Sequence, residues 1–229
     1  MKKTLLLAVV ISLWTCSILT APVAASPITL AEYAANIDGT TSYKPGVVDP
    51  VPSGMNISGF DTDTGLGTIS LTIGGAGTHY AALFVDHEID EAINTFFNEY
   101  GNAVGTPAAG QSWEIDEPGW VFGDIYDNFL ASSLDNSNGV PSTAPDDVSM
   151  AIGWNFSLVA GESANIEWLI SETIPTGFYL QQTDPDSAKS IYFSSNLEIT
   201  GKVIPAPDAL ILVSIGMGLV DCLRRHKKL

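Results

Sequence analysis

The chain has 229 residues, a formal net charge of −17 at pH 7 and two cysteines. Because Cys16 and Cys222 lie near the two ends, the region between them can hold no internal disulfide, no cysteine-ligated zinc and no thiol nucleophile. Residues 26–203 contain three lysines and 24 acidic residues, a net charge of −21 that repels phosphate backbones and excludes nucleic acid as a partner.

The first 25 residues have the pattern of a secretory signal peptide. Two lysines precede an apolar run over residues 5–19, and small residues close the segment up to Ala25. We expect the secretion machinery to export the chain and signal peptidase to cut after Ala25; the alternative is an uncleaved anchor helix. Residues 26–203 then form one extracytoplasmic domain, long enough to bury a sizeable core.

Alternating apolar residues predict β-strands through most of this domain. Residues 67–73, with Ile69, Leu71 and Ile73 inward, and residues 79–85 lie on either side of a glycine-rich segment, which predicts an antiparallel hairpin. Residues 148–158 follow a period of two throughout, as a strand with one buried and one solvated face does. Residues 166–170 resume the pattern after a turn, which predicts a second, longer hairpin.

The remaining segments complete the expected architecture. Two more strands are predicted at residues 177–182 and 190–199, and loops at residues 38–53 and 141–145. Apolar residues at helical spacing predict a helix over residues 88–100, and residues 123–134 fit a second short helix or a turn. The fold class is therefore mainly β: an antiparallel β-sandwich or jelly-roll-like domain with a helical insertion.

Histidine and acidic residues gather before the expected helix. His79, Asp86, His87 and Glu88 are the residue types that bind zinc or manganese, but their spacing differs from the H-E-x-x-H helix pattern. The alternative is an ordinary helix N-terminus, with Asp86 as its cap and the following carboxylates next to the helix dipole.

Two acidic loops make calcium the one candidate cofactor. Asp61 and Asp63 are two positions apart before a glycine, and Asp135 begins a segment similar to the start of a calcium loop. Neither segment matches the twelve-residue EF-hand loop. The alternative is that both are plain Asx or β-turns.

A further acidic cluster lies between two tryptophans. Glu114, Asp116 and Glu117 lie between Trp113 and Trp120. Paired carboxylates can act as acid and base on a glycosidic bond, and tryptophan can contact sugar rings. The alternative is a strand with tryptophan on its buried face and glutamate on its solvated face. Serine-hydrolase, P-loop and dinucleotide-binding motifs are absent from the sequence.

The C-terminus combines a proline-containing break, an apolar segment and a basic cluster. Residues 209–223 would form a helix about 22 Å long, which is short for a hydrocarbon core roughly 30 Å thick. The basic cluster after it would hold that end in the cytoplasm. The break is Pro205, Ala206, Pro207 and Asp208, and the basic cluster includes Arg224, Arg225, Lys227 and Lys228.

This combination resembles the PEP-CTERM sorting signal, whose members carry Pro-Glu-Pro before the helix and are processed by a membrane-embedded exosortase. Here Ala206 replaces the central glutamate, and Asp221 lies inside the apolar segment. The resemblance implies that residues 204–229 are a sorting tail with a transmembrane helix at residues 209–223. It implies an inner-membrane precursor, an exosortase-type processing enzyme as partner and a final location at the cell surface or outside the cell. The alternative is a permanent tail anchor.

Two function hypotheses follow. The first is a non-enzymatic surface or matrix protein, sorted by its tail and associated with exopolysaccharide. The second is a secreted carbohydrate-active enzyme or carbohydrate-binding module on a β-sandwich. A concave pocket that gathers carboxylates would favour the enzyme, and flat sheets would favour the surface protein.

Overall fold

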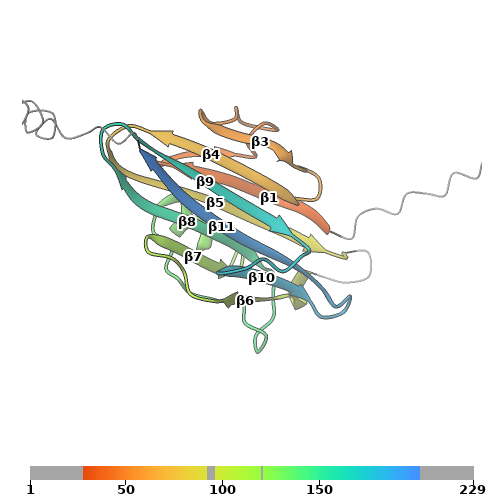
Figure 1. Ribbon diagram of the computed structural model, residues 1–229. Helices are drawn as coiled ribbons and strands as arrows, with labels where there is room; N and C mark the ends of the chain where they lie inside the picture. The colour runs from red at the N-terminus through yellow and green to blue at the C-terminus, as the bar shows by residue number, and fades with distance from the viewer. Residues whose placement is uncertain (1–27, 92–95, 120, 202–229) are drawn as a thin grey trace, which may run out of the picture.

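Two antiparallel β-sheets packed face to face make up this protein, as Figure 1 shows. The computed structural model describes residues 28–91, 96–119 and 121–201. The expected signal peptide, Trp120 and the sorting tail with its proline break and basic cluster lie outside these residues. Within the described ranges, no helix has both the length and the apolar character needed to cross a membrane.

Sheet A has five strands in the order β2-β1-β5-β8-β7, and each neighbouring pair is antiparallel. Its strands are β1 (Ile28–Ile37), β2 (Thr40–Tyr43), β5 (Gly77–Ile89), β7 (Gln111–Asp116) and β8 (Ser149–Leu158).

Sheet B has six strands in the order β3-β4-β9-β11-β10-β6, also antiparallel throughout. Its strands are β3 (Met55–Phe60), β4 (Gly67–Gly74), β6 (Tyr100–Val104), β9 (Glu162–Ser171), β10 (Tyr179–Asp184) and β11 (Lys189–Gly201). Two short helices complete the described elements, the 3-10 helix η1 (Phe96–Asn98) and α1 (Ile125–Leu130). The mainly β class expected from the sequence is confirmed.

The core lies between the sheets and is built from the alternation read in the sequence. The inward residues of β8 include Ile152 and Trp154, and those of β9 include Trp168. The Trp168 indole Nε1 donates to the Ile152 carbonyl oxygen at 3.1 Å, and the Trp154 Nε1 donates to the Ser195 hydroxyl oxygen at 2.8 Å. Each sheet therefore contributes one tryptophan that hydrogen-bonds to the other sheet.

The outer face of sheet A is covered as well, contrary to the expectation of a solvated face on β8. Ile125 and Phe129 of α1 pack against Phe84 and Ala151 of this face. The Asn36 amide donates to the Phe129 carbonyl oxygen at 2.7 Å and so fixes the end of α1 to β1. Ala151 is fully buried for this reason, and on the outer side of β8 only its last part reaches solvent.

The two hairpins expected from the sequence are wrong. β4 pairs with β3 and β9, whereas β5 pairs with β1 and β8. Likewise β8 and β9, separated by a three-residue turn, belong to different sheets. Each of these connections crosses from one sheet to the other, so that the inward side chains of consecutive strands face each other instead of lying side by side.

The described ends of the segment 88–100 do not form the expected helix, and residues 92–95 lie outside the described residues. β5 continues to Ile89, with Asp86 opposite Ser149 in the ladder, so Asp86 is a strand residue and not a helix cap. Of the described part of that segment, only η1 is helical. Residues 38–53, expected as a loop, contain β2. The strands β10 and β11 and the short helix α1 agree with the sequence.

Truncation of Trp154 should reveal how much stability this packing supplies. Trp154 is 4% exposed, so Trp154→Ala should lower the free energy of unfolding by about 3–5 kcal/mol through lost burial and a new cavity. Asn155→Ala, at the exposed next position, should cost less than about 0.5 kcal/mol. Urea unfolding measures both, and equal small losses would show that the β8 face is not packed.

Candidate functional site

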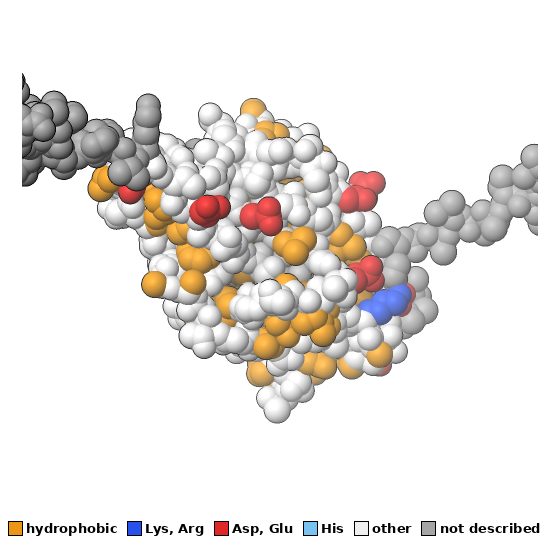
Figure 2. Space-filling view, viewed as in Figure 1, with side chains coloured by type: hydrophobic (Ala, Val, Ile, Leu, Met, Phe, Trp, Pro, Cys, Tyr) orange, Lys and Arg blue, Asp and Glu red, His pale blue; other side chains and the backbone are white. Residues whose placement is uncertain are grey.

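No helix covers the outer face of sheet B over its described strands, in contrast to the outer face of sheet A. This face is toward the viewer in Figures 1 and 2. Its side chains alternate with core residues, so they point away from the sandwich. They are mostly hydroxyl, amide and tyrosine groups, with few charges: Ser70, Thr72, Asn165, Glu167, Tyr179, Gln181, Tyr192, Ser194, Asn196 and Glu198.

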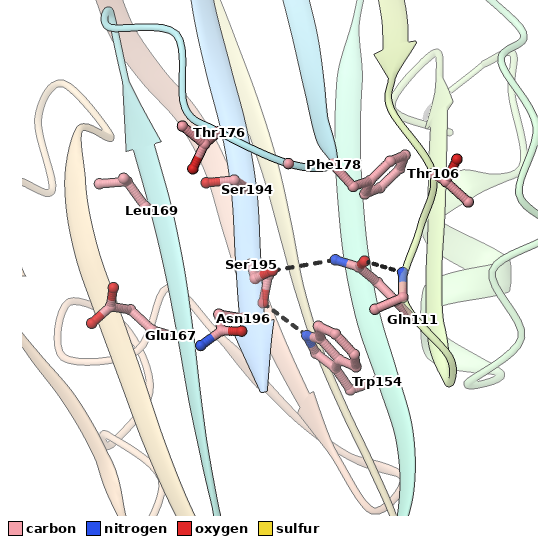
Figure 3. Close-up of a pocket in the computed structure, with 12 residues that line it drawn as sticks. Thr106, Gln111, Trp154, Glu167, Leu169, Thr176, Phe178, Ser194, Ser195 and Asn196 are labelled. Carbon is pink, nitrogen blue, oxygen red and sulfur yellow. Dashed lines mark hydrogen bonds between the residues drawn. The ribbon is translucent and has the colours of Figure 1, made fainter. Parts of the chain in front are cut away.

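A hollow opens on this face where β10 stops covering its neighbour. β10 begins at Tyr179, which pairs with Ser194, so β11 has no partner on that side beyond this point. The resulting cavity has a volume of about 360 Å³ and reaches inward to Trp154 and Phe178. Figure 3 shows Ser195 at its centre, where it accepts from Trp154 and where its carbonyl oxygen accepts from the Gln111 amide at 3.4 Å.

A second hollow of about 240 Å³ continues across β9 to β4. The two hollows share Glu167 and Asn196, so they adjoin. Beside the first hollow, the rings of Tyr179 and Tyr192 pack edge to face with centroids 5.7 Å apart. We call these two hollows the sheet B groove. Its amides, hydroxyls and aromatic rings can hydrogen-bond to and pack against a polyhydroxylated chain.

No sequence motif marks the residues that line the sheet B groove. Glu167 and Asn196 lie in separate strands, and β9 and β11 bring Glu167 opposite Asn196 in the ladder. The only sequence signal was the polar half of each alternating pattern, which any solvated sheet face would share.

A separate cavity of about 590 Å³ gathers carboxylates on the other side of the molecule, at the outer face of sheet A. We call it the carboxylate cavity. Burial raises the pKa of Glu88 to about 7 and that of Asp147 to about 6, and it raises the pKa of Asp86 strongly. Its acidic lining residues are Glu32, Asp86, Glu88, Glu117 and Asp147.

The two histidines of the sequence cluster do not converge. His79 and His87 are eight residues apart on β5, roughly 26 Å along an extended strand. His79 Nδ1 donates to the Asp38 carboxylate at 2.9 Å, and this hydrogen bond raises the pKa of His79. His87 is fully buried, and burial lowers its pKa to about 4.

The acidic residues beside Trp113 hold the cover of sheet A in place. Glu114 is fully buried, not solvated as the strand alternative predicted; its carboxylate accepts from the Asn128 amide at 3.0 Å and from the Asp135 backbone at 3.1 Å. Burial raises the pKa of Glu114 to about 7. Asp116 accepts from the Asp124 backbone at 2.8 Å. Trp113 lies on the opposite face of β7, against Phe178.

These residues include a group that could hold a metal ion. Carboxylate oxygens of Glu114, Asp116 and Asp124 lie within 4.8 Å of one another. The predicted calcium ligand Asp135 borders this group, whereas Asp61 closes its own turn by accepting from the Asp63 and Thr64 backbone amides. Calcium binding at Asp61, Asp63 or Asp135 stays a prediction.

Comparisons of the chain with protein-family models, with curated proteins and with solved structures gave no match.

Thermal unfolding with metal ions tests the calcium prediction. If calcium binds the folded state, a concentration about 100 times the Kd stabilises it by about 2.7 kcal/mol, and a chelator should reverse the rise in Tm. Asp124→Asn should abolish the effect if the site is the group around Glu114, Asp135→Asn if it is the loop that begins at Asp135, and Asp61→Asn if it is the other loop. Magnesium should do less, since it sheds water reluctantly and requires stricter geometry. Equal shifts with both ions would indicate charge screening alone.

Proposed function

We propose that this chain is an exported, non-enzymatic surface protein, sorted by its C-terminal tail, whose β-sandwich binds exopolysaccharide through the sheet B groove. The observation that carries the proposal is the groove itself: an uncovered sheet face with amide, hydroxyl and tyrosine side chains around two adjoining hollows. Such groups can exchange hydrogen bonds with water for hydrogen bonds with sugar hydroxyls over a long, shallow surface.

The charge of the domain narrows the class of polysaccharide. A net charge of −21 over residues 26–203 repels polyanionic chains such as polyuronates. The groove contributes Glu167 and Glu198 and no lysine or arginine to its lining. A neutral polysaccharide is therefore the favoured partner.

The competing hypothesis, a carbohydrate-active enzyme, has one observation in its favour, since the carboxylates gather in a concave cavity. That cavity lies on the outer face of sheet A, however, and the groove lies on the outer face of sheet B. A glycan held in the groove is thus separated from these carboxylates by both sheets. The cavity also lacks the amide groups that the groove offers, since its other lining residues are apolar.

Polysaccharide binding provides the main test. In affinity electrophoresis with the neutral fraction of the native exopolysaccharide, Asn196→Ala should weaken retardation by roughly three- to tenfold in Kd, the loss expected for one or two hydrogen bonds. The matched control is Asn155→Ala, the same exposed substitution on sheet A, which should bind like the unmodified chain. Equal binding by both variants, or preference for an anionic fraction, would contradict the proposal. Release of reducing ends, abolished by Glu88→Gln, would support the enzyme instead.

Mass spectrometry of the mature C-terminus tests the sorting tail. Proline lacks an amide donor and keeps the preceding residue extended, so the break at Pro205 and Pro207 should remain accessible to a processing enzyme. The native protein should then lack residues 209–229, and replacement of both prolines by alanine should leave uncleaved precursor in the inner membrane. A native protein that retains these residues, with an indistinguishable proline variant, would identify an ordinary anchor.

A further inference from the structure

The carboxylate cavity contains negative charge that the protein itself does not neutralise. Its acidic side chains come from β1, β5 and the segments that flank β7 and β8, and its described lining residues include no lysine, arginine or histidine. Asp86 is 4% exposed, with one oxygen accepting from the Ser149 hydroxyl at 3.0 Å. Glu32 accepts from the Tyr43 hydroxyl at 2.6 Å.

Two of the carboxylate oxygens in the cavity have no hydrogen-bond partner. Oε2 of Glu88 and Oδ1 of Asp147 are enclosed, and neither has a hydrogen-bond donor among the described residues. Buried polar atoms in native proteins are nearly always hydrogen-bonded, because an unpaired one costs the free energy of its lost hydration. The two side chains are only partly buried and line the cavity, so their carboxyl groups are under-satisfied and face a space that a ligand with N–H donors can enter.

The walls of the cavity are apolar, and they are unusually exposed. Phe97, Val121 and Phe122 have exposed fractions of 59%, 79% and 67%, and Ala31 and Pro118 complete the lining. Large apolar side chains at the rim of a polar cavity are typical of a binding site for a molecule with an apolar part.

A single metal ion does not fit this lining. In the described part of the chain, the acidic group with ligand atoms within 4.8 Å of one another is the one around Glu114, and none of the cavity carboxylates belongs to it. A volume of about 590 Å³ also exceeds what one ion needs, and apolar walls offer it no ligands. The volume and the apolar walls therefore favour a ligand larger than a metal ion, with an apolar part.

We propose that the carboxylate cavity binds an aliphatic diamine, a cation with an ammonium group at each end and methylene groups between them. One ammonium pairs with the carboxylates of Glu88 and Asp147, whose side chains line the cavity. The methylene groups lie against Phe97, Val121 and Phe122, and the second ammonium is attracted by the remaining carboxylates. This site is independent of the polysaccharide groove.

The binding should depend on pH. Among the described residues, the charged groups that act on these carboxylates are acidic: Asp147, Glu88 and Glu32 act on Asp86, Asp147 and Glu91 act on Glu88, and Asp146 and Glu117 act on Asp147. Together with burial, they raise the three pKa values, so part of the cavity is protonated at neutral pH. Because an ammonium favours the ionised carboxylates, binding releases protons, and affinity should rise between about pH 5 and pH 8.

Calorimetry with 1,5-diaminopentane as the probe tests the proposal on the purified 229-residue chain in detergent. We expect saturable binding of one diamine per chain at about pH 8, with protons released to the buffer. Asp147→Asn should weaken binding by about tenfold or more, because it removes one charge-assisted partner. The matched control is Glu198→Gln, which removes one exposed charge on sheet B and should leave the Kd unchanged.

A second variant and a neutral ligand separate the site from general effects. Val121→Ser alters a side chain that is 79% exposed, so the fold should persist while the apolar wall, and with it the affinity, is weakened. The uncharged 1,5-pentanediol should not bind, and Asn196→Ala should keep the diamine affinity. Absence of saturable binding, or equal losses in Asp147→Asn and Glu198→Gln, would overturn the proposal. Calcium binding in the cavity without diamine binding would overturn it too.

Discussion

The structure depends on two indole groups that join its sheets. Trp168 is the largest of the fully buried side chains, and its Nε1 donates across the core to β8. Trp154 reaches in the opposite direction from β8 to β11. Dispersion and apolar burial hold the two sheets together but allow one sheet to slide over the other. A buried indole N–H must meet its one acceptor on the other sheet, and this requirement fixes the relative position of the sheets. The groove follows from this placement, because Trp154 and Ser195 form its inner end.

The outer faces of sheets A and B differ in how far other segments cover them, and so in the ligands that they can bind. Sheet A is buried on both sides, by the core and by α1 with its flanking segments. Glu114 of β7 holds these covering segments in place, because its carboxylate accepts from the Asn128 amide and from the Asp135 backbone N–H. The carboxylate cavity lies at the margin of the same outer face, where its side chains are only partly desolvated. Sheet B has no such cover over most of its described strands and offers a surface for a long ligand.

The sequence predicted which residues face inward far better than which strands pair. The alternation around Trp154 and Trp168 identified core positions correctly. Periodicity, however, reports only the side on which a residue lies, and it is the same for a hairpin and for a connection that crosses between sheets. The helix prediction failed at its described ends because the apolar residue Ile89 ends β5, which is buried on both faces, and does not start a helical face.

The candidate sites were harder to predict, because each is assembled from distant parts of the chain. Asp86 and Asp147 meet only because β5 pairs with β8, with Asp86 opposite Ser149. Glu167 and Asn196 meet through the pairing of β9 with β11. No local motif marks either site. The raised pKa values likewise come from desolvation, which depends on packing that a sequence does not display.

The crossing connections have a consequence for how the chain acquires its fold. Since β4 and β5 enter different sheets, each gains its second partner late: β4 pairs with β3 and then with β9, and β5 pairs with β1 and then with β8. Contacts between residues so distant in sequence close large loops, which slows folding. Neither sheet is therefore complete until β8 and β9 have been synthesised. If the chain is exported as proposed, a secretion channel that accepts only unfolded polypeptide would receive it before either sheet is complete.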